Sequence, residues 1–308
     1  MDRPFDAYLH LGIVHFMLYP ALMGGDGPVV DTAQTIAQDG FFNVLEITRV
    51  NDPVARTSLK RLAETAHLVL GFGAQPIILG GKLDLTAADP ARRAAAVATV
   101  KAGVDQASEL GIKLLALMDG PNTAPAPGTE DAALARLVDS LKQLCQHAAR
   151  YGMWISLEQF DRAIDKKSLL GPVELCVRAS AMVRAETPNF GLTLDLSHLP
   201  LLGETPEHAI GMARDHLIHA HVGNCVVRDK THPQYGDQHP VFGDPAGEND
   251  VPELTRYLQA LFRAGYFEKP LPTPMPVVTF EVRPMADQSP AAVLGNCQRT
   301  FQQAWVRA

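Results

Sequence analysis

Four side chains that can bind a metal ion stand at the ends of short apolar runs in the second half of the chain. They are Glu158 after residues 154–157, Asp195 after 190–194, His221 within 217–222 and Glu281 after 276–280. Three carboxylates and one imidazole suit Mn²⁺, Mg²⁺, Co²⁺ or another first-row divalent ion. Soft thiolate ligands are absent from the set, because Cys225 comes only after His221, in the next loop. If the four runs converge, the set predicts one divalent metal centre.

Each of these residues also has a purely structural interpretation. A carboxylate that follows a strand can cap the next helix, which suits Asp195 better than Glu158 or Glu281. A histidine within an apolar strand is usually a hydrogen-bonded core residue, and this interpretation fits His219. Three carboxylates buried together without a cation would nevertheless be costly. The combination therefore favours a metal site over separate structural roles.

The elements that would position these groups are clearest between Phe190 and Cys225. Two apolar runs, 190–198 and 217–225, flank a segment at 206–216 that has helical character. This order predicts a strand, a helix and a second strand, with ionisable groups at the carboxyl ends of both strands. In parallel α/β folds this edge of the sheet carries the chemistry.

The same unit is expected eight times along the chain. Further strands are predicted at residues 8–17, 41–47, 67–72, 112–118, 154–157 and 276–280. Further helices are predicted at 32–38 with Asp31 as its cap, 53–66, 90–110, 131–150, 173–185, 251–264 and 290–306. Eight β-α units predict one (β/α)8 TIM barrel over residues 1–308. A doubly wound sheet usually has fewer strands, and no Gly-x-Gly-x-x-Gly turn opens a helix here.

A long polar segment, 226–250, follows the seventh expected strand. It contains Arg228, His232, Asp237 and His239 among glycines and prolines. Loops of this length without regular structure are usually functional lids or disordered segments. We expect this one to add a catalytic group to the site or to cover a substrate as large as a glycoside.

Further candidates face the same end of the expected barrel. His219 and His221 alternate on one strand, so both point to one face, where one can bind the metal while the other contacts the substrate or supports the ligand. His198, three residues after Asp195, can bind a substrate hydroxyl or pair with a carboxylate. The substrate-binding candidates are therefore His198, His219, Arg228, His239, Glu46 and His15, the last two at the ends of the second and first strands.

Composition places the chain among ordinary globular proteins and argues against several partners. The net charge of −7 includes no basic run, which disfavours nucleic acid and anionic membranes as partners. No apolar stretch reaches the roughly 18 residues of a membrane span. The four cysteines form no C-x-x-C pair, and the first residues lack the basic-then-apolar order of a signal peptide. We therefore expect reduced thiols in a cytoplasmic protein.

The order of motifs resembles the xylose-isomerase-like barrel superfamily. The motifs are strand-Glu158, Leu194-Asp195-x-x-His198, His219-x-His221-Val222-Gly223 and Phe280-Glu281, which together cover residues 154–284. The nearest resemblance is to sugar isomerases and epimerases, such as ketose 3-epimerases and hydroxypyruvate or inosose isomerases. It implies one divalent ion, above all Mn²⁺, with Mg²⁺, Co²⁺ or Zn²⁺ also compatible, held by Glu158, Asp195, His221 and Glu281. It also implies that Glu158 and Glu281 are the catalytic acid/base pair and that His198 touches substrate.

The implied activity is proton transfer beside the carbonyl of a small carbohydrate, through an enediolate that the metal stabilises. The resemblance leaves room for a homo-oligomer. The sequence departs from the epimerases after the His-x-His strand, where Val226 and Val227 precede Arg228 and the loop is far longer. The alternative is therefore a lyase or dehydratase that uses the same metal site on a keto-sugar, a keto-inositol or a 3-keto-glycoside, including C-glycoside cleavage. An abasic-site endonuclease and a non-enzymatic binding protein are two further hypotheses, which the acidic charge and the polar strand ends disfavour.

Overall fold

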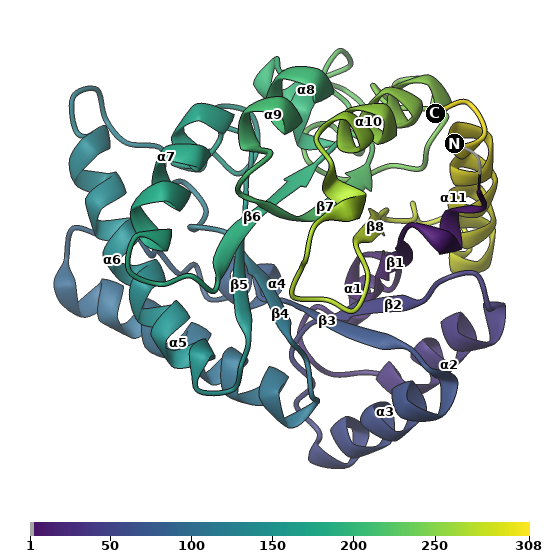
Figure 1. The fold of residues 1–308 in the computed structure, drawn as a ribbon, viewed down its shortest axis with the longest axis horizontal. Coiled ribbons are helices and arrows are strands. Elements are labelled where there is room, and N and C mark those ends of the chain that lie inside the picture. The colour runs from purple at the N-terminus through teal and green to yellow at the C-terminus, as the bar shows by residue number, and fades with distance from the viewer. Residues whose placement is uncertain (1–2) are drawn as a thin grey trace.

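Eight parallel strands close into one barrel in the computed structural model, which describes residues 3–308 (Figure 1). The strands are β1 (His10–Val14), β2 (Val44–Ile47), β3 (Val69–Gly73), β4 (Leu114–Leu117), β5 (Trp154–Glu158), β6 (Phe190–Asp195), β7 (Leu217–Gly223) and β8 (Val277–Glu281). Each strand pairs in parallel with the next, and β8 pairs with β1. The predicted (β/α)8 fold is confirmed.

Helices form the outer layer of the barrel (Figure 1). The long ones are α2 (Val29–Asp39), α3 (Pro53–Ala66), α5 (Pro90–Glu109), α6 (Glu130–Ala149), α7 (Val173–Arg184), α9 (Pro206–Ala213), α10 (Val251–Arg263) and α11 (Pro290–Trp305). The sequences of the strands are almost continuously apolar because both faces of each strand are buried. Helices cover the outer face, and the inner face points into the packed interior of the barrel. In β4, β6 and β7 every residue is buried.

Several helices begin where the sequence places a capping residue before a proline. Asp52 accepts a hydrogen bond from Val54 N at the start of α3, and Asp89 accepts one from Ala91 N at the start of α5. Ser289 does the same for α11. A proline follows each cap, at a position where the missing N–H costs nothing.

The first predicted strand and the first predicted helix differ from the structure. The run at 8–17 divides into β1 and a four-residue helix, α1 (His15–Leu18). Helix α2 begins at Val29, so Asp31 lies in its first turn and does not cap it. Two more short helices, α4 (Gln75–Gly80) and α8 (His198–Leu202), occupy βα loops, and three 3₁₀ turns span Phe5–Ala7, Pro20–Leu22 and Tyr266–Glu268.

The register between strands sets the level at which the polar ends meet. Between β6 and β7 the pairing shifts after Leu192, so that Asp195 stands opposite His221. Between β7 and β8, Gly223 stands opposite Glu281. Irregularities of this kind re-aim side chains near barrel rims. Without the shift, the carboxylate and the imidazole would lie at different heights.

The segment between β7 and α10 is ordered over the mouth of the barrel. Asn224 Oδ1 accepts hydrogen bonds from the backbone N–H groups of Cys225 (2.9 Å), Glu248 (3.0 Å) and Asn249 (2.8 Å). Its Nδ2 donates to Val241 O at 2.9 Å. One asparagine thus ties the start of the segment to its middle and end. Across residues 3–308, no helix has the length and apolarity needed to cross a membrane.

Candidate active site

The four predicted ligands converge at the carboxyl end of the barrel. Ligand atoms of Glu158, Asp195, His221 and Glu281 all lie within 4.8 Å of one another. Glu158 and Asp195 are completely buried, and the Glu281 side chain is 12% exposed. Because four neighbouring strands supply one side chain each, the cluster depends on barrel closure.

His221 is held between carboxylates on both sides of its ring. Its Nδ1 lies 3.2 Å from Glu158 Oε1 and 3.0 Å from Glu281 Oε2. Its Nε2 lies 3.1 Å from Glu46 Oε2. Burial lowers the pKa of His221, but the charges of Glu46 and Glu158 outweigh it and raise that pKa well above its ordinary value.

Glu46 lies beneath the cluster and joins two histidines. Its Oε1 is 2.7 Å from His219 Nε2, and its other oxygen faces His221. Burial raises the pKa of Glu46, but the two histidines lower it by more than burial raises it. The resulting pKa is well below the usual range of a glutamate. His219 therefore contacts Glu46 and the ring of His221, at a centroid distance of 4.9 Å, and its Nδ1 is buried and unpaired among the described residues.

The cluster fits a divalent cation. Three carboxylates share a largely buried volume, and Asp195 Oδ2 has no hydrogen-bond partner among the described residues. Unpaired buried anions at this spacing repel one another. With a cation bound, an Nε2–H bond from His221 to Glu46 would leave the Nδ1 lone pair for the ion, as in the carboxylate–histidine–metal arrangement. The donor set is thus that of a hard or borderline metal ion.

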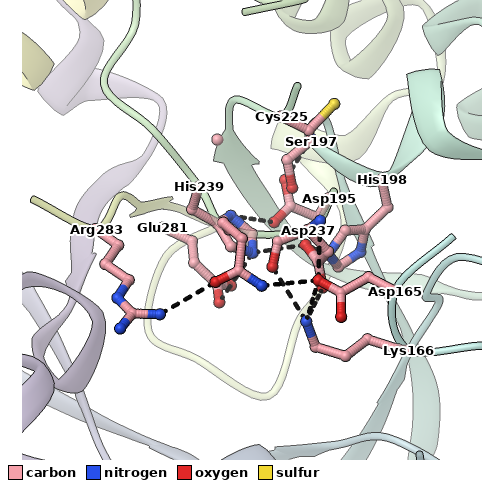
Figure 2. A network of polar contacts seen from close by, with 12 residues as sticks. Asp165, Lys166, Asp195, Ser197, His198, Cys225, Asp237, His239, Glu281 and Arg283 are labelled. Atoms are coloured by element: carbon pink, nitrogen blue, oxygen red, sulfur yellow. Dashed lines mark hydrogen bonds and ion pairs between the residues drawn. The ribbon is translucent and has the colours of Figure 1, made fainter. Parts of the chain in front are cut away.

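A second polar group lies beside the first and is centred on Asp237 (Figure 2). Its carboxylate lies 3.0 Å from His198 Nε2, 2.9 Å from His239 Nε2 and 3.0 Å from Lys166 Nζ. Burial lowers the pKa of His198, but Asp237 and Asp195 raise it to about 10. Burial likewise lowers the pKa of His239, while Glu281 and Asp237 raise it to about 9.

His239 links this second group to the ligand cluster. Its Nε2 lies 3.5 Å from Glu281 Oε1, and its Nδ1 lies 3.9 Å from Asp195 Oδ2. Its backbone has a positive φ of 54°, which is uncommon for a residue with a side chain. The carbonyl of His239 accepts a hydrogen bond from Arg283 N at 2.7 Å, so the loop after β8 holds this conformation in place.

The β5–α7 loop holds Asp237 from the other side (Figure 2). Asp165 Oδ2 accepts hydrogen bonds from Asp237 N at 3.2 Å and from Gln238 Nε2 at 2.8 Å. The charges of Asp237 and Asp165 raise the pKa of Lys166 above its usual range despite burial, so Lys166 is a stable cation here. The segment after β7 is therefore clamped between two loops.

A cavity of about 360 Å³ opens beside the cluster. Its apolar lining comprises Phe16, Met17, Met23, Pro76, Leu79 and Phe160. Its polar lining includes Arg49, Gln75, Lys166, Asp237, Gln238, His239, Glu281 and Arg283. Gln75 Nε2 donates to Glu158 Oε2 at 2.6 Å, which connects the cavity to a second member of the cluster. A ligand here would reach the carboxylates directly.

Three residues of interest lie outside this arrangement. Arg228 is exposed, with Nε 2.9 Å from Glu248 Oε1. His15 is buried behind the cavity wall, where Nε2 meets Thr32 Oγ1 at 2.8 Å, and burial lowers its pKa to about 3. His232 lies 3.7 Å from Asp244, away from the cluster. The other substrate-binding candidates, His198, His219, His239 and Glu46, all contact members of one of the two polar groups.

Reasoning from sequence did not find three residues of the site. Asp237 enters the sequence analysis only as part of the long loop, and Lys166 and Gln75 have no role there. Asp237 and Lys166 lie in polar segments, whereas Gln75 directly follows the apolar run at 68–74 but has no charge to mark it as a site residue. The Asp237-x-His239 spacing within a polar loop was the available signal. It could not show that both side chains turn inward.

The chain belongs to the xylose isomerase-like TIM barrel family, whose profile matches residues 34–271. A search of curated protein sequences finds no significant match.

Solved structures with the same fold cover almost the whole chain. The structure of an L-ribulose 3-epimerase has a TM-score of 0.74 at 16% identity, covering 97% of this chain and 95% of its own. A D-psicose 3-epimerase from Clostridium cellulolyticum H10, solved with D-tagatose, has a TM-score of 0.65 at 18% identity and covers 97% of both chains. A 3-keto-D-glucoside 4-epimerase from E. coli has a TM-score of 0.67 at 16% identity, covering 96% of this chain and 99% of its own. Identities this low establish the fold alone.

Proposed function

We propose that this protein is a divalent-metal-dependent isomerase or epimerase of a sugar or keto-sugar. The observation that carries the proposal is the convergence of Glu158, Asp195, His221 and Glu281 within 4.8 Å beside a cavity. The solved structures that share the fold include epimerases of ketoses and of a 3-keto-glucoside, which supports the substrate class. Mn²⁺ is the metal that we expect.

The chemistry that suits this site is proton transfer at the carbon beside a carbonyl. When bound, the divalent ion would act as a Lewis acid that stabilises the negative charge developing on the substrate oxygen. Glu158 and Glu281 come from β5 and β8, on either side of β6 and β7. One carboxylate would take the proton from carbon, and the other would return a proton to the opposite face, so the carbon inverts without net loss of atoms.

Neighbouring residues would hold the substrate for this transfer. Gln75 donates to Glu158 and fixes the direction of its remaining lone pairs. His198 and His239 both contact Asp237, and their N–H groups could reorient toward substrate hydroxyls. Positioning of the reacting carbon near a carboxylate supplies much of the rate enhancement in such reactions.

Deuterium exchange tests the proposal directly. Ketoses such as D-psicose, D-tagatose and L-ribulose, and a 3-keto-glucoside, would be incubated with manganese-loaded protein in D₂O and followed by NMR. We expect deuterium at the carbon beside the carbonyl. Glu158→Gln and Glu281→Gln should slow the exchange by about 10²–10⁴-fold, the usual contribution of a general acid or base. Glu268→Gln, at an exposed position, is the matched control.

Metal content would be measured in each variant, because both glutamates are also proposed ligands. Absence of exchange with every compound, in Mn²⁺, Mg²⁺ and Co²⁺ alike, would overturn the proposal.

A second candidate function is elimination from the same enediolate. His239 Nε2 lies 3.5 Å from Glu281 Oε1 and lines the cavity, where it could protonate a leaving oxygen as the bond from that oxygen to carbon breaks. Mass spectrometry would then detect a product without water or aglycone. His239→Gln should remove that product and leave exchange measurable. A wild-type product with the mass of its substrate would favour epimerisation.

A further inference from the structure

The cavity beside the carboxylate cluster is lined by two chemically different sets of side chains. One set contains Gln75, Asp237, His239 and Glu281, which are hydrogen-bonding or charged groups. Another part is formed by Phe16 and Met17 on α1, Met23 after the turn at Pro20–Leu22, and Pro76 and Leu79 on α4. The second set has no polar side-chain atom other than thioether sulfur.

An apolar wall of this kind does not suit a free sugar along its whole length. A ketose carries a hydroxyl on nearly every carbon, and burying a hydroxyl without a hydrogen-bond partner is unfavourable. The volume of about 360 Å³ lies in the range of about 300–1,000 Å³ that encloses drug-sized ligands. Aromatic rings and thioethers pack favourably with one another. The wall is therefore suited to an aromatic group attached to the sugar.

Two arginines belong to the polar lining of the same cavity. Arg49 follows β2, and its Nε donates to Gly24 O at 3.0 Å. Arg283 follows β8, and its terminal nitrogen donates to Gln238 Oε1 at 3.1 Å. Both line the cavity, both are half-buried, and neither makes an ion pair with a carboxylate anywhere in residues 3–308. A guanidinium has five N–H donors, so each arginine can bind a further oxygen.

We propose that the substrate is an aryl glycoside whose sugar carries a keto group and whose aromatic ring carries an acidic oxygen, either phenolic or carboxylate. The sugar lies at the carboxylate cluster, the ring lies against Met17, Met23 and Leu79, and the acidic oxygen reaches Arg49 or Arg283. This inference rests on the proposed function, because it assumes that the sugar end reacts at the cluster.

Binding of glycosides that lack a carbonyl tests the inference without turnover. Methyl, phenyl and 4-carboxyphenyl glycosides, in both the glucose and the galactose series, would be titrated into manganese-loaded protein by calorimetry. We expect the phenyl compound to bind at least about tenfold more tightly than the methyl compound in one series, with a more negative heat-capacity change. The carboxyphenyl compound should bind a few-fold more tightly still, and this second gain should fall at high salt.

Variants separate the two parts of the site. Met23→Ser and Leu79→Asn should remove most of the phenyl-over-methyl preference, whereas Met182→Ser, at an exposed position on α7, should keep it. Arg49→Gln and Arg283→Gln should remove only the gain from the carboxylate. Arg92→Gln, exposed on α5, is the control.

Equal binding of phenyl and methyl glycosides in both series would overturn the inference, whatever the variants do. Equal binding of phenyl and carboxyphenyl compounds would overturn the role of the arginines. Deuterium exchange on free ketoses, measured on the same protein, reports separately on the proposed function. Deuterium exchange on ketoses together with equal binding of phenyl and methyl glycosides would rule out the aryl substrate and leave the proposed function standing.

Discussion

The two ring nitrogens of His221 face different partners, and this decides which nitrogen can bind a metal. Nε2 faces Glu46, whereas Nδ1 faces Glu158 and Glu281. A carboxylate accepts hydrogen bonds only, so without a cation both ring nitrogens can donate. With a cation among Glu158 and Glu281, the contact to Glu46 would keep the proton on Nε2 and leave the Nδ1 lone pair for the ion. Glu46 also accepts from His219, and its two oxygens are thus both engaged. Glu46 acts through His221 and is a positioning residue.

Glu46→Gln should therefore weaken metal binding. The amide of glutamine has one oxygen, which can accept from only one of the two histidines. Its N–H groups face the other histidine, whose facing ring nitrogen must then give up its proton. We expect the Kd for Mn²⁺, measured by calorimetry, to rise about 10–100-fold. Turnover should recover at saturating Mn²⁺. Glu64→Gln, exposed on α3, is the matched control. A Kd within twofold of wild type would show that Glu46 does not orient His221.

The four proposed ligand residues could be picked out from the sequence because each one follows or ends a buried apolar run. Glu158, Asp195 and Glu281 are the last residues of their strands, where a charged side chain is conspicuous. Asp237 gave no such signal. Its place depends on Asp165 and Gln238, which meet only after two distant loops pack together. Contacts of that kind have no local pattern in the sequence.

At the scale of elements, long helices were predicted well and short ones were missed. Helix α3 has the predicted bounds, because Asp52 and Pro53 mark its start. Helices α1 and α4 have four and six residues, too few to show a helical period. These two short helices carry most of the apolar cavity wall. The sequence therefore carries more information about the proposed reaction than about the proposed substrate.

The segment between β7 and α10 should depend on its single asparagine anchor. Asn224→Ala removes three accepted bonds and one donated bond at once. We expect hydrogen exchange across 226–250 to rise strongly and unfolding free energy to fall by about 2–4 kcal/mol, from buried groups left unpaired. Asn224→Asp keeps the three accepted bonds and should protect the segment more than alanine does. Equal exchange in wild type and Asn224→Ala would contradict the anchor.

A buried carboxyl group gives the loop after β4 a pH dependence. Asp119 Oδ2 accepts from Leu169 N at 3.0 Å and from the Thr123 hydroxyl. Burial raises the pKa of Asp119 to about 6. The folded state thus holds this proton more tightly than the unfolded chain does. The stabilisation is complete below about pH 4 and is lost as the pH rises through about 6.

Asp119→Asn should remove this dependence. Compared with the variant, wild type should gain about 2–3 kcal/mol of unfolding free energy as the pH falls from 7 to 4. Urea unfolding of both proteins at pH 4, 5.5 and 7 measures the difference in unfolding free energy between wild type and Asp119→Asn. The contributions of other titrating groups cancel in this difference. A difference that does not vary with pH would place the pKa of Asp119 near its ordinary value.

At the scale of the whole molecule, the proposed metal site joins four strands and should contribute to stability. Removing the ion leaves like charges of Glu158, Asp195 and Glu281 close together inside the barrel. Dialysis against EDTA should lower Tm by several degrees. Adding Mn²⁺ at about 1,000 times its Kd should raise the free energy of unfolding by about 4 kcal/mol. Calcium, which prefers more and longer oxygen contacts, should restore less. An unchanged Tm would argue that no ion binds there.

The residues proposed to catalyse the reaction and the residues proposed to bind the aromatic group of the substrate come mostly from different halves of the chain. The ligands come from β5 to β8, whereas the apolar wall comes from the short segments after β1 and β3. Changes in residues 16–25 or 76–80 can therefore alter which molecule enters without replacing the groups proposed to move protons. The proposed substrate preference thus depends on two short stretches between strands. Laboratory selection aimed at a new substrate should concentrate its diversity in those same two stretches.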